Sequence, residues 1–126
     1  MLKNSPVAAS MPATDIDRAR KFYTESLGLE EVKTSDPTAI MFKAGEGSML
    51  MLYKRGPTKA DHTVAGFKVE NIEAEMEDLR SRGVKFEEYD IPEMGIKTVN
   101  GVATMGEVKS AWFKDTEGNI LSIAQM

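Results

Sequence analysis

The fold of this chain is decided by the stretch Val7-Ala-Ala-Ser-Met11, followed by Thr14-Asp-Ile-Asp-Arg-Ala-Arg-Lys-Phe-Tyr23 and closed by Leu27-Gly-Leu29. The same pattern returns as Val64-Ala-Gly-Phe-Lys-Val69, then Asn71-Ile-Glu-Ala-Glu-Met-Glu-Asp-Leu79, closed by Arg82-Gly-Val84. Each copy consists of an alternating apolar run, a helix-capping residue, an amphipathic helix and a glycine stop. A repeated supersecondary unit predicts one domain built from two equivalent modules. We expect any binding site to lie between the modules.

Length, charge and cysteine content exclude several classes of protein. With 126 residues the chain has room for one domain. Its net charge of −4, with basic residues scattered among acidic ones, does not suit a nucleic-acid binder. The absence of cysteine excludes disulfides and thiolate metal ligands. Since no signal peptide or long apolar span is present, we expect a cytoplasmic protein.

The chain divides at its one convincing linker, residues 55–61, which contains a Gly-Pro pair. Module one covers about residues 6–54, and module two covers about residues 62–125. Module two carries an excursion over residues 91–107 that module one lacks, with the hairpin signal Asn100-Gly101 at its centre. Two interpretations stay open for this excursion: an additional hairpin arm, or a flap over a cavity.

Two stretches of the chain carry a family resemblance. They are the helix stretch Asp15-Ile-Asp-Arg-Ala-Arg-Lys-Phe-Tyr23 and the turn Trp112-Phe-Lys-Asp-Thr-Glu-Gly-Asn119. They resemble the first-helix signature and the Phe-x-Asp-Pro-x-Gly-Asn turn of the vicinal oxygen chelate superfamily, with Thr116 in place of the usual proline. That superfamily comprises glyoxalase I, extradiol dioxygenases, fosfomycin-resistance enzymes and bleomycin-resistance proteins. The resemblance implies an α+β fold of two βαβββ modules, forming a curled mixed sheet around a cleft with one helix per module outside. It also implies a homodimer, because the family commonly pairs its modules between chains.

In the metal-dependent members of this superfamily, four strands each contribute one cleft-facing His, Glu or Gln. Aligned on the two motifs, this chain has Ala8, Leu50, Val64 and Ser122 at those positions. None of them binds a divalent ion as an imidazole or a carboxylate does. We therefore expect no metal and no other cofactor.

Strand periodicity separates a helix-facing set of residues from a cleft-facing set. The helix-facing set is apolar: Val7, Ala9, Met11, Met49, Met51, Tyr53, Ala65, Phe67, Val69, Leu121 and Ile123. The cleft-facing set is small, apolar and sparsely hydroxylated: Ala8, Ser10, Leu50, Leu52, His62, Val64, Gly66, Ile120, Ser122 and Ala124. This cleft-facing set is typical of a cavity wall for an organic ligand.

Three further residues are candidates for the site. His62, the single histidine, is either a general base or an exposed residue that leaves the linker. Trp112, the single tryptophan, lies opposite Ser122 in the cleft if Gly118 forms a bulged three-residue loop, and in the core if the loop has four residues. Met105, in the excursion, suits an adaptable ligand contact.

The function that follows is metal-independent binding of a small organic molecule, as in the bleomycin-resistance proteins that the chain resembles. We expect its ligand-binding residues to be Ala8, Ser10, Leu50, Leu52, His62, Val64, Met105, Trp112 and Ser122. The alternative is an enzyme, a glyoxalase-related lyase or isomerase that acts on a small organic substrate. Neither function involves nucleic acid or a membrane.

Overall fold

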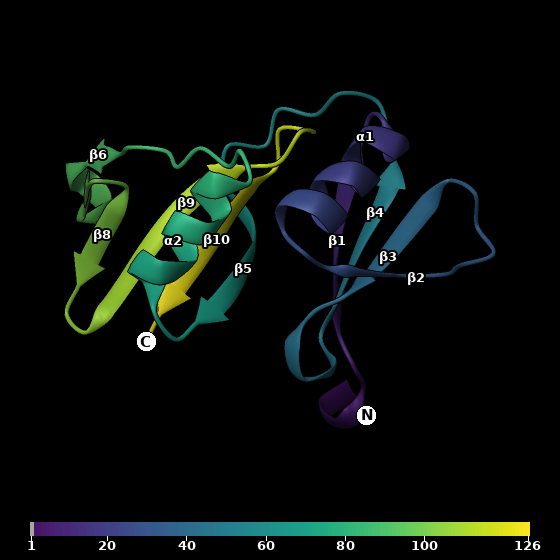
Figure 1. Cartoon of the computed structure of the whole chain (residues 1–126), viewed down its shortest axis with the longest axis horizontal. Helices are drawn as coiled ribbons and strands as arrows, with labels where there is room; N and C mark the ends of the chain where they lie inside the picture. Colours follow the sequence, from purple (N-terminus) through teal and green to yellow (C-terminus); the bar gives the residue numbers. More distant parts are fainter. Residues whose placement is uncertain (1) are drawn as a thin grey trace. The chain divides into compact units, whose positions relative to one another are not determined.

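The computed structural model describes residues 2–126 and has an α+β fold, as the sequence predicts. The chain forms two compact units: the chain up to Lys59 together with Thr116–Gly118, and Ala60–Asp115 together with Asn119–Met126. We call these unit 1 and unit 2. Each unit contains one α-helix and one mixed sheet, of four strands in unit 1 and six in unit 2 (Figure 1). No helix in this described range is long and apolar enough to cross a membrane.

Unit 1 has the predicted βαβββ order. Its elements are η1 (Leu2–Asn4), β1 (Ala8–Ala13), α1 (Ile16–Lys21), the π-helical turn η2 (Phe22–Ser26), β2 (Glu30–Val32), β3 (Ala39–Lys43), η3 (Gly45–Gly47) and β4 (Met49–Lys54). The strand order is β1-β4-β3-β2, with β1 parallel to β4 and the other pairs antiparallel. Helix α1 begins after Asp15, whose side chain accepts a hydrogen bond from the backbone N–H of Arg18.

The core of unit 1 lies between its sheet and its helical segment. Tyr23 is fully buried, stacks on Phe42 with ring centroids 5.5 Å apart, and lies with its hydroxyl 4.0 Å from the sulfur of Met11. Met11 is paired with Leu52 across the β1–β4 ladder, and Leu50 is paired with Phe42 across the β3–β4 ladder. Since paired residues share a sheet face, Leu50 and Leu52 face the helix.

The predicted faces of β4 are therefore wrong by one residue. Leu50 and Leu52, expected in the cleft, are buried at 4% and 0% exposure on the helix side. Met49, Met51 and Tyr53, expected in the core, lie on the opposite face and are half-buried. The sequence of this strand is apolar on both faces, so its alternation cannot tell which face is covered.

Unit 2 repeats the plan and extends it. Its elements are β5 (Thr63–Val69), α2 (Ile72–Ser81), β6 (Asp90–Ile91), η4 (Pro92–Met94), β7 (Ile96–Val99), β8 (Val102–Met105), β9 (Val108–Lys114) and β10 (Ile120–Gln125), with the strand order β5-β10-β9-β8-β7-β6. Asn71 caps α2 through the backbone N–H of Ala74. The buried stripe of α2 consists of Ile72, Met76 and Leu79.

The excursion over residues 91–107 is built into the sheet of unit 2. It forms the β7–β8 hairpin, whose tip residues Asn100 and Gly101 have φ values of 53° and 83°. Gly101 is buried and its backbone N–H donates to Glu88. A Cβ at Gly101 would stand 3.0 Å from the terminal methyl of Met76 on α2. The hairpin tip thus lies against α2, and the arm interpretation describes it better than the flap interpretation.

Residues 84–89, which follow α2, form one isolated bridge, Phe86 with Phe113. Beyond the bridge, the backbone N–H of Glu87 donates to the carbonyl of Trp112 at 2.8 Å. The segment then leaves β9, because the backbone of Tyr89 hydrogen-bonds to Thr98 on β7 instead. The segment thus contacts β9 and then β7 without a continuous ladder.

Candidate functional site

The face of the unit 2 sheet that points away from α2 presents the single tryptophan. Asp115 and Asn119 close the β9–β10 turn through a backbone hydrogen bond of 3.0 Å, and Gly118 has a φ of 87°. In the resulting register Trp112 lies directly opposite Ser122. Its neighbour Phe113 is buried on the helix side, so Trp112 is on the other face and half-buried. The predicted register for the bulged turn is confirmed.

Two side chains fix the position of the indole. Tyr89 lies beside Trp112 with ring centroids 5.6 Å apart and ring planes inclined at 73°, an edge-to-face pair. The indole N–H donates to the hydroxyl of Thr63 at 3.1 Å. Together Trp112 and Tyr89 form an aromatic corner, the arrangement that a flat organic molecule can stack against on one side and abut on the other.

Tyr89 is a site residue that the sequence analysis missed. Its backbone N–H donates to the hydroxyl of Thr98, and the Thr98 N–H donates to the Tyr89 carbonyl. Burial raises the pKa of the Tyr89 hydroxyl, and the nearby negative charge of Glu87 raises it further. The phenol is therefore protonated at neutral pH and can donate a hydrogen bond. No local motif marks Tyr89, because β7 brings it to Trp112.

Small residues lie in the same cross-strand row as the indole. Ser122 on β10 is paired with Trp112 of β9 on one side and with Gly66 of β5 on the other. A Cβ at Gly66 would stand 2.6 Å from the hydroxyl oxygen of Ser122, so that hydroxyl occupies the place of the missing side chain. Val64 falls at an irregularity of the β5–β10 ladder, which pairs Thr63 with Ile120 and Ala65 with Leu121.

Two other predicted ligand-binding residues lie at the margin of unit 2. Met105 is 40% exposed at the end of β8, opposite Val108. His62 lies before β5 with a side chain that is 71% exposed, and its Nδ1 is 3.9 Å from Asp61. The exposed interpretation of His62 fits this position better than the general-base interpretation, which needs a positioned partner near a substrate. Their contact with a ligand stays a prediction.

The open face of unit 1, which points away from α1, differs from the predicted one. Ala8 and Ser10 lie on it as expected, paired with Met49 and Met51 of β4. Leu50 and Leu52 do not, because they belong to the core, and their contact with a ligand stays a prediction. Met49 and Met51 therefore lie on this face, where the leucines were expected.

None of the four residues aligned with metal-ligand positions offers an imidazole or a carboxylate, and one of them, Leu50, points to the helix side. Among residues 2–126 no group of three His, Cys, Asp or Glu side chains is placed to hold a metal ion. The residues present do not form the chelating site of the metal-dependent relatives.

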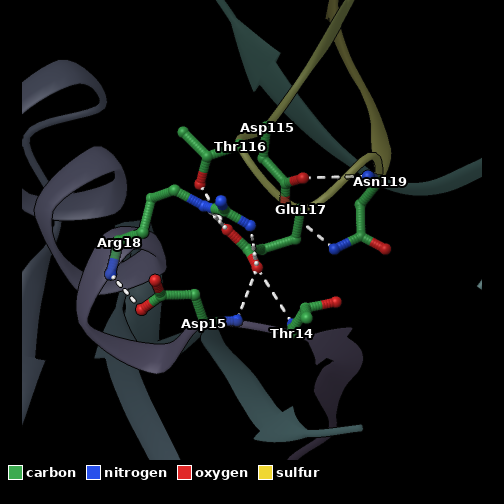
Figure 2. A network of polar contacts seen from close by, with 7 residues as sticks. All are labelled: Thr14, Asp15, Arg18, Asp115, Thr116, Glu117 and Asn119. Carbon is green, nitrogen blue, oxygen red and sulfur yellow. Dashed lines mark hydrogen bonds and ion pairs between the residues drawn. The ribbon is translucent and has the colours of Figure 1, made fainter. Parts of the chain in front are cut away.

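A second feature missed by the sequence analysis is the carboxylate of Glu117, which unit 1 holds completely buried at 0% side-chain exposure. It accepts hydrogen bonds from the backbone N–H groups of Thr14 and Asp15, both at 2.9 Å (Figure 2). The guanidinium of Arg18 donates to both oxygens, at 2.8 and 3.1 Å, and the Thr116 hydroxyl donates at 2.7 Å. These four groups make five hydrogen bonds to one carboxylate, and Figure 2 shows them converging on it.

The ionised form of Glu117 is strongly favoured in this network. Burial by itself raises the pKa of Glu117, but the hydrogen bonds from Arg18, Asp15 and Thr116, with the charge of Arg18, outweigh it and lower the pKa to about 2. The carboxylate thus accepts from two backbone N–H groups at the start of α1, that of the capping residue Asp15 and that of the preceding Thr14. It belongs to the structure of unit 1 and not to a ligand site.

Comparison with known proteins agrees with this architecture. The family model described as Glyoxalase/Bleomycin resistance protein/Dioxygenase superfamily matches residues 6–123. Among solved structures, UcmS2 is 25% identical with a TM-score of 0.73, and the match covers 97% of this chain and 98% of that chain. TnmS3, described as an antibiotic binding protein from Streptomyces sp. CB03234, is 20% identical with a TM-score of 0.71, covering 99% and 98%.

A lactoylglutathione lyase from Agrobacterium tumefaciens is 21% identical, with a TM-score of 0.65 and coverage of 99% of this chain and 96% of that chain. At such identities TnmS3 and the lyase share the fold with this chain, which says nothing about a shared activity. A search of curated protein sequences found no match.

Proposed function

The chain belongs to the Glyoxalase/Bleomycin resistance protein/Dioxygenase superfamily, and we propose that it binds a small organic molecule on the Trp112 face of unit 2 without a divalent metal. The observation that carries this proposal is the aromatic corner of Trp112 and Tyr89 beside the Ser122 hydroxyl. A ligand gains affinity there from apolar burial on two rings, and orientation from a few hydroxyl groups. The protein would act by sequestration or delivery of its ligand, as a homodimer.

The chemistry of the face supports binding more than catalysis. Its polar groups are the hydroxyls of Thr63, Tyr89, Ser110 and Ser122, none of which has a histidine or carboxylate placed to activate it as a nucleophile. A lyase or isomerase needs a base with a pKa near neutrality or a Lewis acid near the substrate. His62 is the single histidine, and its side chain is largely exposed.

Replacement of Trp112 by Ala is expected to weaken ligand binding by about 1–3 kcal/mol, the scale for loss of an aromatic contact and its buried area. Bleomycin and the planar dye anilinonaphthalene sulfonate are suitable first ligands. In the wild-type protein they should change the fluorescence of the single tryptophan, so the signal has one origin. Calorimetry then compares the affinities of wild type and variant.

Trp112→Phe is the matched control, because it keeps an aromatic ring and loses the indole N–H bond to Thr63. It should retain most of the affinity. The variant Trp112→Ala should stay folded, since the side chain is half-buried on an open sheet face. An unfolded Trp112→Ala whose residual folded fraction binds normally would place the indole in the core and contradict the proposal.

Elemental analysis of the tag-free protein is expected to show zinc, nickel, manganese and iron far below one atom per chain. The reason is that the aligned positions hold Ala8, Leu50, Val64 and Ser122 instead of imidazoles and carboxylates. Protein purified after growth with each added metal provides the strictest form of the measurement. A near-stoichiometric divalent ion that dialysis against chelator removes together with ligand binding would favour the glyoxalase-related alternative.

A further inference from the structure

The corrected register of β4 brings three methionines together on the open face of unit 1. Met41 on β3 is paired directly with Met51 on β4. Met49 lies two residues before Met51 and therefore on the same face. All three are half-buried, whereas the helix-side residues Ile40 and Leu52 of the same strands are 1% and 0% exposed. We call Met41, Met49 and Met51 the thioether triad.

The spacing of the thioether triad lets its sulfur atoms converge. Directly opposed residues in an antiparallel ladder have Cβ atoms roughly 4.5–5.5 Å apart, and diagonal neighbours such as Met41 and Met49 are roughly 7–8 Å apart. Methionine is unbranched and has three rotatable bonds, so its sulfur reaches well beyond its own Cβ. Rotamer changes alone can bring the three sulfurs to one point above the sheet, without movement of the backbone.

Thioether sulfur is a soft ligand that selects monovalent soft cations over the hard and borderline divalent ions. We propose that the thioether triad binds one Cu(I) ion, with three sulfur ligands from two adjacent strands. This ion is distinct from the divalent metals of the family, and its ligands all belong to unit 1, whereas the Trp112 face belongs to unit 2. The proposal therefore stands independently of the proposed organic ligand.

The surroundings of the thioether triad suit a soft cation. Its cross-strand neighbours are Val32 beside Met41, Ser10 beside Met51 and Ala8 beside Met49, so no hard anionic ligand is paired with a triad residue. Lys43 is paired with Met49 on one side, and on the other side it is paired with Glu30 of β2. Glu30 thus lies opposite this lysine at the outer edge of the sheet.

Nuclear magnetic resonance of the protein labelled at the methionine methyl groups tests the proposal directly. Ag(I) is the probe, since it shares the closed-shell soft character of Cu(I) and is stable in air. Of nine methionines, we expect the methyl resonances of Met41, Met49 and Met51 to shift and saturate at one equivalent of Ag(I). The fully buried Met11 and the 66% exposed Met94 should not shift. Shifts that are spread over exposed methionines, or an absence of saturable shifts, would overturn the site.

Affinity for Cu(I) itself is measured anaerobically by competition with the chelator bicinchoninate. Met41→Leu, Met49→Leu and Met51→Leu each keep an apolar side chain of similar volume and remove one sulfur. Each should weaken binding by roughly tenfold or more, and the triple variant should not compete at all. Met94→Leu is the matched control and should bind Cu(I) like the wild type. A triple variant that retains wild-type affinity would refute the proposal, while tryptophan fluorescence with an organic ligand reports separately on unit 2.

Discussion

Glu117→Gln is expected to lower the free energy of unfolding by about 2 kcal/mol at neutral pH, and Glu117→Ala by about 3 kcal/mol. The drop in the pKa of Glu117 from 4.5 to about 2 corresponds to roughly 3 kcal/mol of stabilisation of the folded state. The Arg18 side chain is 51% exposed, so solvent screens part of that energy and the smaller figure applies to Gln. In the Ala variant the N–H groups of Thr14 and Asp15 lose their acceptor as well.

The pH dependence follows from the direction of the shift. Because the pKa of Glu117 is lower in the folded state, its stabilisation is complete above the unfolded value of 4.5 and is lost as the pH falls toward 2. Urea unfolding followed by circular dichroism between pH 7 and pH 2 should show the wild type converging on Glu117→Gln at the acid end.

Glu77→Gln, on the exposed side of α2, is the control and should change the unfolding free energy by less than about 0.5 kcal/mol. A difference between wild type and Glu117→Gln that stays constant down to pH 2 would show that charge is not the cause.

Leu52→Ala is expected to cost about 2–5 kcal/mol of unfolding free energy, while Met51→Ala costs about 1 kcal/mol or less. Leu52 is fully buried and faces Met11 and Ile40 across its two ladders. Its truncation therefore leaves a cavity beneath α1, because a packed core collapses only partly around a missing side chain. Met51 lies on the open face, where truncation removes contacts but leaves no enclosed cavity.

Chemical unfolding of the two single variants in parallel measures this difference, since they are neighbours on one strand and differ only in the face they occupy. Equal costs for the two variants, or a larger cost for Met51→Ala, would restore the face assignment made from the sequence and would remove the basis for the thioether triad.

The sequence alone predicts the βαβββ order found in unit 1, and it offers the register that sets Trp112 opposite Ser122 as one of two alternatives for the turn. These features depend on signals within a few residues. Gly118 adopts a positive φ that glycine accepts at little cost, and this fixes the β9–β10 turn and every pair along the ladder behind it.

Features that depend on distant partners can be identified only from the tertiary structure. The run from Met49 to Tyr53 is apolar on both faces, so the register with β1 and the packing of α1 were needed to show that Leu50 and Leu52 are core. Tyr89 reaches Trp112 only because β7 holds its backbone. Glu117 finds its partners about a hundred residues earlier in the chain, at Thr14 and Arg18. No local pattern encodes such a contact, because its energy exists only once both segments are folded.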